Sequence, residues 1–408
     1  AANAQETNRL LLDEKIGERA LREIYLASFE YPVKVAKPAA VMCAYNKING
    51  IYCSENKWLL TDILRKEWGY KGLVMSDWGA VSNRPQGVYA GLDLEMPGDI
   101  GHNRQVILDA VNDGTLSIDT VDIAVRRVLN MINNTTLVNG KISARFDEHA
   151  SLAKELAVDS AVLMKNKNNI LPLNDNQKYL VIGEMFEKMR YQGAGSSLIR
   201  PYKLTTPQQA FDANGVSYKY EKGYILDSFE SDDALVEQAM LRVERADTVI
   251  FFGGLSEYAE SEGFDRKTLS LPANQLSLIK RIAKLNKKIV FVMFGGSPVD
   301  TSFDTCVDAL LNMYLPGEEG GQAAYELLFG KACPSGRLCE TWPMKYEDVP
   351  FCDEFTQTLN DRYKESIFVG YRYYSTFGVP VKYPFGYGLS YTDFSYSNMR
   401  IEKCQYFI

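Results

Sequence analysis

Residues 41–81, VMCAYNKINGIYCSENKWLLTDILRKEWGYKGLVMSDWGAV, contain the pattern that decides the fold. The apolar run 41–45 predicts a buried strand, the helical spacing of apolar residues over 58–68 predicts an amphipathic helix, and 72–75 predicts a second strand. Strands that alternate with helices indicate a parallel α/β architecture. Working outward, apolar residues also recur at helical spacing between residues 10 and 30, which predicts a helix there.

The alternation continues toward the C-terminus. Residues 92–96 predict a third strand, 118–132 predict a helix, and the polar stretch 133–149 has the composition of a linker. A second α/β unit follows, with helices expected at 153–163, 234–246 and 276–285 and buried strands at 179–182, 248–252, 289–294 and 309–314. Such a unit is a doubly wound or sandwich-type sheet, whose ligands meet the carboxyl ends of the strands.

The chain is too long for one core of ordinary size, because it has 408 residues, of which 46% are hydrophobic. After Pro343 the sequence is rich in Tyr, Pro and Gly, which predicts loops, and it becomes β-like from about residue 385. The predicted domains are 1–136 and 151–345, with a linker at 137–150, a loop-rich connection at 346–384 and the start of a third module at 385–408.

Charge and cysteine content narrow the function classes. The net charge of -7 argues against nucleic acid, whose phosphates attract a basic face, and it suits a neutral ligand. Seven cysteines without a CxxC pair argue against a disulfide framework or a zinc site, and reduced thiols fit a cytoplasmic protein. No run of eighteen apolar residues and no signal peptide is found, so neither a membrane span nor export is expected.

Asp77 is the first candidate for chemistry. In the predicted topology it follows the strand at 72–75 and stands at that strand's carboxyl end, where α/β barrels collect catalytic groups. The neighbouring Trp78 offers an indole face that suits a sugar ring. The alternative is that Asp77 caps the following helix.

Glu262 is the second candidate. It lies in an acidic loop, EYAESEGFDR, together with Glu260 and Asp265, and crowded carboxyl groups retain a proton more readily, as a general acid requires. A solvated acidic loop is the plainer alternative. The glycine-rich run 191–197, YQGAGSS, lacks the lysine of a P-loop, so a ligand-contacting loop is favoured over a nucleotide cradle.

Several long strings together resemble glycoside hydrolase family 3 of the β-glucosidase type. They are residues 41–81, quoted above, with AANAQETNR (1–9), GLDLEMPG (91–98), AVLMKNKNNILPL (161–173), ESEGFDR (260–266), LPGEEGGQAAYELLFGKACPSGRLCETWP (315–343) and YPFGYGLSYTDFSY (383–396). The resemblance implies the C-terminal part of a TIM-like (β/α) barrel in 1–136, an α/β sandwich domain in 151–345, and the start of a fibronectin type III-like module at 385–408.

The resemblance also implies a retaining exo-acting β-glycosidase, with β-glucosidase expected first and β-xylosidase as the alternative. Asp77 matches the nucleophile and Glu262 the acid/base, with Glu260 as second choice for the latter. Residues that match the substrate pocket are Arg9, Tyr45, Trp78 and Ser196, with Ser197 as the alternative to Ser196. Two carboxylates suffice for the reaction, so neither a metal nor an organic cofactor is expected.

The family's barrel begins upstream of residue 1, so at most about half of an eight-stranded barrel is expected here. The isolated chain is therefore expected to be weakly active or inactive. The expected partners are a small β-glycoside or oligosaccharide, and either a second copy of the chain or a chain that supplies the missing barrel half. The competing hypotheses of other classes are a non-catalytic sugar-binding or split fragment and a nucleotide-binding protein.

Overall fold

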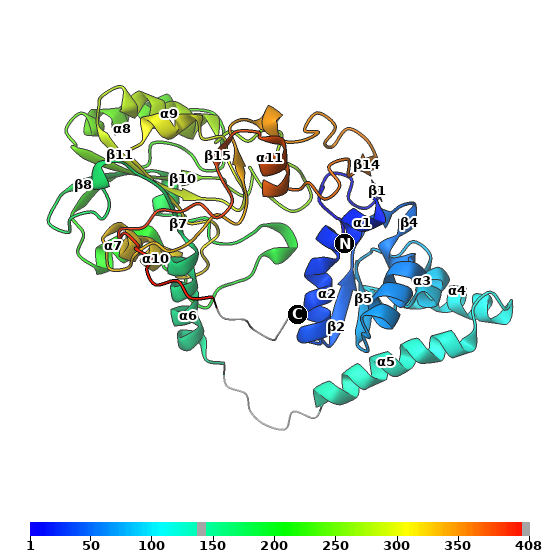
Figure 1. Cartoon of the computed structure of the whole chain (residues 1–408). Coiled ribbons are helices and arrows are strands. Elements are labelled where there is room, and N and C mark those ends of the chain that lie inside the picture. Colours follow the sequence, from blue (N-terminus) through cyan, green and yellow to red (C-terminus); the bar gives the residue numbers. More distant parts are fainter. Residues whose placement is uncertain (137–143, 402–408) are drawn as a thin grey trace. The chain divides into compact units, whose positions relative to one another are not determined.

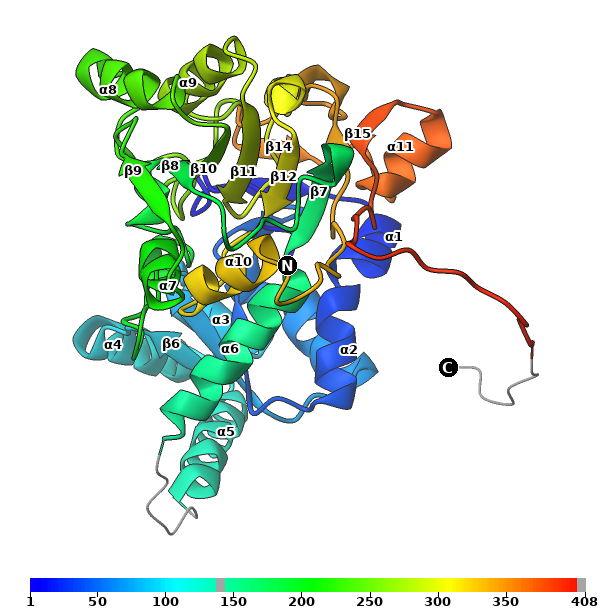
Figure 2. The same ribbon diagram turned by 90° about the vertical axis from the view of Figure 1, so that its left-hand side faces the viewer.

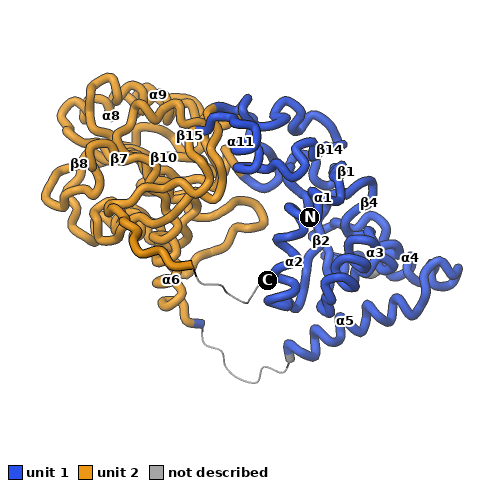
Figure 3. Tube along the Cα trace, viewed as in Figure 1, with its two compact units in different colours: residues 1–144, 261–267, 345–381 blue, residues 145–260, 268–344, 382–408 orange. Residues whose placement is uncertain are grey.

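The computed structural model describes residues 1–136 and 144–401, which form two compact units. Unit 1 comprises residues 1–144, 261–267 and 345–381, and unit 2 comprises residues 145–260, 268–344 and 382–408 (Figure 3). The short segment 261–267 thus leaves the surrounding sequence of unit 2 and packs with unit 1. No helix in the described part of the chain is long and apolar enough to cross a membrane.

A three-stranded parallel sheet forms the centre of unit 1. Its strands are β2 (Ala40–Cys43), β5 (Leu73–Trp78) and β6 (Leu94–Met96), in the order β2-β5-β6. The connection from β2 to β5 contains a helix with π-type turns, η3 (Trp58–Glu67), and the connection from β5 to β6 contains α3 (Arg84–Ala90). This part of the predicted strand–helix alternation is confirmed, because apolar side chains of η3 pack against those of the sheet.

A second sheet of unit 1 joins segments far apart in the sequence. Its order is β14-β1-β3-β4, from β14 (Asn360–Arg362), β1 (Asp13–Lys15), β3 (Lys47–Ile48) and β4 (Ile51–Tyr52). The strands β3 and β4 form a hairpin whose turn, Asn49-Gly50, has positive φ at both residues, as a two-residue hairpin turn of this type requires. β1 runs parallel to β14, and this pairing fixes the late segment in unit 1.

The helix predicted between residues 10 and 30 is wrong in its first part. Residues 13–15 form strand β1, and helical structure begins only at α1 (Glu18–Ala20) and continues through η1 (Leu21–Tyr25) and α2 (Ala27–Val35). Cross-strand pairing on both sides of β1 overrides the local spacing, and Gly17 precedes the first helical residue.

Two longer helices complete the described sequence of unit 1 before residue 137, namely α4 (Ile100–Asn112) and α5 (Ile118–Thr136). The expected linker at 133–149 is only partly a linker, because α5 runs to Thr136 and α6 (Phe146–Ser160) of unit 2 begins at Phe146. Residues 137–143 lie outside the described part. The polar composition of the stretch reflects exposed helix ends as well as a connection.

Unit 2 is built on a six-stranded sheet in the order β7-β12-β11-β10-β8-β9 (Figure 2). All neighbouring pairs are parallel except the edge strand β7, which is antiparallel to β12. The strands are β7 (Val162–Asn166), β8 (Tyr179–Ile182), β9 (Tyr218–Glu221), β10 (Thr248–Gly254), β11 (Lys288–Phe294) and β12 (Ala309–Asn312).

Helices cover both faces of this sheet (Figure 1). One face carries α8 (Asp233–Val243) and α9 (Ala273–Ala283), and the other carries α6, α7 (Pro207–Ala213) and α10 (Gly320–Leu328). Along β10, Val249 and Phe251 enter one core and Ile250 and Phe252 enter the other. A parallel strand that is buried on both faces needs a continuous apolar run. The sequence of β10, TVIFFGG, is such a run, and all of its residues are buried.

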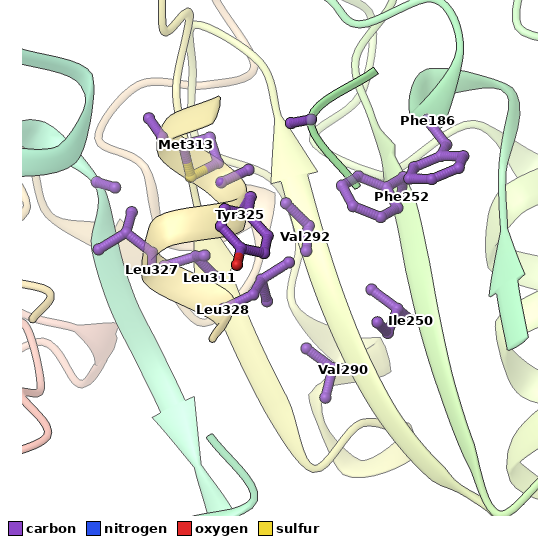
Figure 4. Packing of buried hydrophobic residues seen from close by; sticks show 14 of the residues in the cluster. Phe186, Ile250, Phe252, Val290, Val292, Leu311, Met313, Tyr325, Leu327 and Leu328 are labelled. Carbon is purple, nitrogen blue, oxygen red and sulfur yellow. The ribbon is translucent and has the colours of Figure 1, made fainter. Parts of the chain in front are cut away.

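Figure 4 shows the core on the α10 side. Tyr325, Leu327 and Leu328 of α10 lie over Val292 and Leu311 of the sheet, among other members of the cluster. Phe186 and Phe252 pack with ring centroids 5.0 Å apart. Unit 2 therefore has a complete core of its own.

The predicted strands at 179–182, 248–252, 289–294 and 309–314 correspond to β8, β10, β11 and β12. Strands β7 and β9 were not predicted. The helix expected at 153–163 ends at Ser160, and β7 begins at Val162. The sequence of β9, YKYE, is polar, and the strand lies at the sheet edge with alternating burial. The fold class is α/β, as predicted.

Shorter elements connect these parts and finish the chain. They are η2 (Cys53–Glu55), η4 (Lys167–Asn169), η5 (Glu184–Phe186), η6 (Gly195–Ser197), η7 (Ser302–Cys306), β13 (Trp342–Pro343), η8 (Tyr346–Asp348), α11 (Tyr371–Phe377) and β15 (Val381–Tyr383). In the region predicted to be β-like from residue 385, the described part up to residue 401 contains one bridge, Leu389 to Leu163, and no strand.

Candidate active site

Asp77 is the last residue but one of strand β5, so it lies inside the strand rather than after it. The ladder between β5 and β6 pairs Met75 with Leu94 and Trp78 with Met96, so two residues of β5 face one residue of β6. This is a β-bulge, a device that re-aims side chains and is common beside active sites. Asp77 caps no helix, because the N-cap of α3 is Asn83, whose side chain accepts from Gln86 N.

Tyr45 lies just beyond the carboxyl end of β2, the parallel neighbour of β5, and it is buried. Its hydroxyl donates to the carbonyl oxygen of Trp78 at 3.1 Å. Burial raises the pKa of Tyr45, and a hydrogen bond to the Asp77 carboxylate and the negative charge of Glu262 raise it further. The charge of Arg9 acts in the opposite direction. One phenol therefore lies close to both carboxyl groups.

Arg9 connects Tyr45 with the acidic loop. Its guanidinium lies over the Tyr45 ring at 4.9 Å from the centroid, and Nη2 donates to Glu262 Oε1 at 2.7 Å. Nη1 donates to Glu6 Oε2 at 3.0 Å. Burial alone would lower the pKa of Arg9, but the hydrogen bond to Glu262 and the charge of Glu6 outweigh it, so this pKa is raised. Arg9 is therefore a cation held between two carboxylates.

The loop that carries Glu262 belongs to unit 1 by its contacts. The Asp265 carboxylate accepts from the backbone N–H of Glu6 at 3.0 Å and from that of Thr7 at 2.7 Å. Gly263 N donates to Glu6 Oε2 at 2.8 Å, and Gly263 has φ +94°, a conformation that favours glycine. The fold thus assembles Asp77, Tyr45, Arg9 and Glu262 within one unit.

Glu260, the second choice for the acid/base, lies in unit 2 and is already engaged. Its carboxylate accepts from Gly296 N and from Ser297 Oγ, each at 2.5 Å. Arg190 lies 3.9 Å away. This carboxylate stabilises loops at the carboxyl edge of the unit 2 sheet, and the arrangement favours Glu262 over Glu260 as the partner of Asp77.

The remaining predicted site residues differ in position. The Trp78 side chain is 63% exposed, so its indole is open to a ligand. Ser196 is exposed in the short turn η6 of unit 2, next to Ser197, whose hydroxyl donates to Ala194 O at 3.2 Å. The structure does not group Ser196 with the unit 1 residues.

Glu6 is a residue that sequence reasoning missed, although it stands in the quoted string AANAQETNR. An acidic residue directly before a threonine and three residues before Arg9 gave no periodic signal. Among the described residues, no group of three or more His, Cys, Asp or Glu side chains is placed to hold a metal ion.

Paired carboxyl groups held around a tyrosine and an arginine, on an α/β unit, define the class of carboxylate-based hydrolases. The comparisons with known proteins give the family. The model of the glycosyl hydrolase family 3 N-terminal domain matches residues 9–131, and that of the family 3 C-terminal domain matches residues 161–391. The chain belongs to glycoside hydrolase family 3.

Among curated relatives, the thermostable β-glucosidase B of Acetivibrio thermocellus is 44% identical over 99% of this chain and 54% of its own length. The exo-α-(1→6)-L-arabinopyranosidase of Bifidobacterium longum is 40% identical over 99% of this chain and 55% of its own length. The crystal structure of the Bifidobacterium adolescentis family 3 β-glucosidase superposes with a TM-score of 0.91 at 42% identity, covering 96% of this chain and 58% of that one. The chain thus spans about half the length of the curated relatives.

Proposed function

We propose that this chain carries the catalytic groups of a retaining exo-acting β-glucosidase, which hydrolyses terminal β-D-glucosyl residues. The observation that carries the proposal is the chain of contacts from Glu262 to the residue after Asp77. Arg9 donates to Glu262 Oε1 at 2.7 Å and lies over the Tyr45 ring, and the Tyr45 hydroxyl donates to the carbonyl oxygen of Trp78 at 3.1 Å. The β-glucosidase relatives support the same reaction. The two carboxyl groups of a retaining glycosidase must lie roughly 5–5.5 Å apart, and their shared neighbour fits that requirement.

In the first step, an Asp77 oxygen attacks the anomeric carbon and the glycosidic C–O bond breaks. Glu262 gives its proton to the leaving oxygen, so a covalent glycosyl–Asp77 ester and a free aglycone alcohol result. In the second step, Glu262 takes a proton from water, and the water oxygen displaces Asp77 from the anomeric carbon. Two inversions retain the anomeric configuration.

The neighbours have defined roles in this scheme. Tyr45, whose pKa is raised by burial and by the Asp77 carboxylate, keeps its proton beside that carboxylate and helps to orient the oxygen that attacks. Arg9 donates to Glu262 Oε1 at 2.7 Å and holds this carboxyl group in position. Trp78, exposed and next to Asp77, packs against the sugar ring. The exposed Ser196 is the fourth residue that we propose as a polar contact to the substrate.

Sugar preference is tested by comparing substrates. One relative is named an arabinopyranosidase, and a β-xylosidase is the alternative function. Both act on pentopyranosides, which lack the hydroxymethyl group of glucose, so pentosides are the substrates to compare with the glucoside. Aryl β-glucoside, β-xyloside and α-L-arabinopyranoside are therefore assayed side by side. We expect the largest kcat/KM for the glucoside, and a larger value for either pentoside would reassign the substrate.

Labelling with a 2-deoxy-2-fluoro glucoside tests the nucleophile. We expect the glycosyl label on the peptide that contains Asp77, and no label in the Asp77→Asn variant. A label on a peptide without Asp77 contradicts the assignment. Sugar binding without any turnover or label would instead indicate a non-catalytic sugar-binding fragment.

For the fold, we propose that unit 1 is the C-terminal part of a TIM-like barrel, that unit 2 is the α/β sandwich domain, and that residues from 385 begin a fibronectin type III-like module. The parallel order β2-β5-β6 with intervening helices supports the first assignment. The edge strand β2 has no outer neighbour among the described residues, and Met42 on it is 56% exposed.

The partner we propose is a polypeptide that supplies the remaining strands of this barrel. An apolar pocket lies beside β2, lined among others by Phe29, Val33, Val41, Met42 and Leu64. An exposed edge with an apolar pocket beside it is unfavourable in water and suits further parallel strands. A second copy of this chain is the alternative partner.

A further inference from the structure

The acidic loop is joined to the N-terminal segment by an interlocked set of bonds around Glu262. From one side, Asp265 accepts from the backbone N–H groups of Glu6 and Thr7, at 3.0 and 2.7 Å. From the other side, the Glu6 carboxylate accepts from Gly263 N at 2.8 Å. Each segment thus supplies one carboxylate to the other's backbone.

Glu6 Oε2 is shared by two donors that both belong to the surroundings of Glu262. One is Gly263 N, the peptide group directly after Glu262, and the other is Arg9 Nη1 at 3.0 Å. The second guanidinium nitrogen of Arg9 binds Glu262 Oε1 at 2.7 Å. Glu6 therefore contacts both the backbone that carries Glu262 and the cation that binds its side chain.

Charge explains why a carboxylate is needed at this position. An arginine beside a single carboxyl group favours its ionised form, whereas a second carboxylate on the same arginine weakens that effect and repels a second negative charge. The side chains of Glu6, Arg9 and Glu262 are 32%, 21% and 25% exposed, so solvent screens these charges only in part. The titratable groups around Glu262 include Arg9, Glu6, Asp265 and Tyr45.

We propose that Glu6 is a positioning residue that divides the charge of Arg9 and holds the Gly263 peptide, so that Glu262 keeps the proton it delivers to the leaving oxygen. This inference rests on the proposed function, because it needs Glu262 as the acid/base. Glu6 acts through Arg9 and the loop backbone and does not touch the reacting atoms.

The substitution Glu6→Gln separates charge from structure. The glutamine retains an oxygen for Gly263 N and nearly the same volume, and Asp265 still anchors the loop to residues 6 and 7. Only the negative charge of residue 6 is lost. Glu18→Gln is the matched control, because Glu18 is an exposed glutamate that also pairs with an arginine, Arg22, at 2.8 Å.

Two aryl β-glucosides measure the acid function in the chain co-expressed with the N-terminal barrel segment of a family 3 relative. With a poor leaving group such as phenoxide, we expect Glu6→Gln to lower kcat/KM about tenfold, a part of the roughly 10²–10⁴-fold that acid–base catalysis supplies. With 2,4-dinitrophenoxide, which needs little protonation, we expect less than about a twofold change. The alkaline limb of kcat/KM should move to lower pH by about one unit, as tenfold corresponds to one pKa unit. Glu18→Gln should match the wild type.

A second measurement does not need turnover. The carboxyl ¹³C resonance of Glu262, assigned by its loss in Glu262→Gln, is titrated in the full 408-residue chain labelled with [¹³C]glutamate. We expect a lower titration midpoint in Glu6→Gln than in the wild type and in Glu18→Gln. An unchanged midpoint, or equal losses of kcat/KM for both leaving groups, overturns the inference.

The two proposals fail in different ways. If Glu262→Gln retains full activity toward the phenyl glucoside, the proposed function itself is wrong and the inference falls with it. If Glu262→Gln loses that activity while Glu6→Gln changes kcat/KM equally for both leaving groups, only the role of Glu6 is wrong.

Discussion

At the residue scale, the candidate active site is a chain of contacts rather than a set of isolated acids. The Tyr45 hydroxyl donates to the carbonyl oxygen of Trp78, the residue after Asp77. The Tyr45 ring packs under Arg9, and Arg9 donates to Glu262. Each link fixes the next, because a carboxylate that already accepts a hydrogen bond has fewer orientations to lose when substrate binds. Preorganisation of this kind is what catalysis by two carboxylates requires.

Tyr45→Phe tests the first link. The variant keeps the ring under Arg9 but removes the hydroxyl that donates to Trp78 O and lies beside the Asp77 carboxylate. We expect kcat to fall by about tenfold to a hundredfold, less than the roughly 10²–10³-fold that follows the loss of an oxyanion-hole donor, with little change in thermal stability. Steady-state kinetics with an aryl β-glucoside, alongside a melting curve, measure both. An unchanged kcat would remove Tyr45 from the site.

A second pair of acids lies away from the reaction. Glu14 on β1 and Asp361 on β14 are Cα partners in a parallel ladder, so their side chains share one face of the sheet. Glu14 is completely buried, and burial together with the charge of Asp361 raises its pKa to about 8. Burial also raises the pKa of Asp361. The pairing of β1 with β14 thus costs least when a proton is present.

This pair predicts a pH dependence of stability. The folded-state pKa of Glu14 lies above its ordinary value of 4.5, so folded protein binds the proton more tightly than unfolded protein. The stabilisation is present below about pH 4.5 and is lost as pH rises toward about 8. The urea midpoint of the wild type should be lower at pH 8 than at pH 5. In Glu14→Gln this difference should be smaller. Equal pH dependence of the two proteins would contradict the assignment.

At the element scale, the strand ends of unit 2 depend on glycine. Gly254 ends β10 with φ +134°, and a Cβ added there would lie 1.8 Å from the carbonyl oxygen of Phe294. Gly215 also has a positive φ, +69°, but nothing lies within 4 Å of its added Cβ. The two positions separate the clash from the backbone preference.

Gly254→Ala should therefore destabilise unit 2 more than Gly215→Ala. We expect about 1 kcal/mol for Gly215→Ala, the cost of the left-handed conformation, and several times that for Gly254→Ala, because two neighbouring strands must move apart. Chemical unfolding of both variants measures the difference. Similar losses in the two would show that the end of β10 relaxes freely.

At the scale of the whole molecule, the completeness of the two units differs. The six-stranded sheet of unit 2 is covered on both faces by its own helices, whereas the edge strand β2 of unit 1 lies beside an apolar pocket without an outer neighbour among the described residues. Unit 2 thus has what independent folding needs, and unit 1 exposes surface that a partner polypeptide would bury.

Co-expression tests this difference. We expect the 408-residue chain alone to hydrolyse an aryl β-glucoside weakly or not at all, and to gain at least about tenfold in rate when co-expressed with the N-terminal barrel segment of a family 3 relative. Met42→Lys, a charge on the exposed face of β2, should abolish the gain without changing the unfolding of unit 2. Full activity of the chain alone would contradict the prediction.

Continuous apolar runs and long motifs are local signals. They were enough to predict the α/β class and the four buried strands β8, β10, β11 and β12, and to single out the candidates Asp77 and Glu262. The folded chain was needed to show that residues 13–15 pair as a strand, that segment 261–267 packs with unit 1, and that Glu6 contacts the surroundings of Glu262. These features depend on contacts between residues hundreds of positions apart, and no periodicity within a short window encodes such contacts.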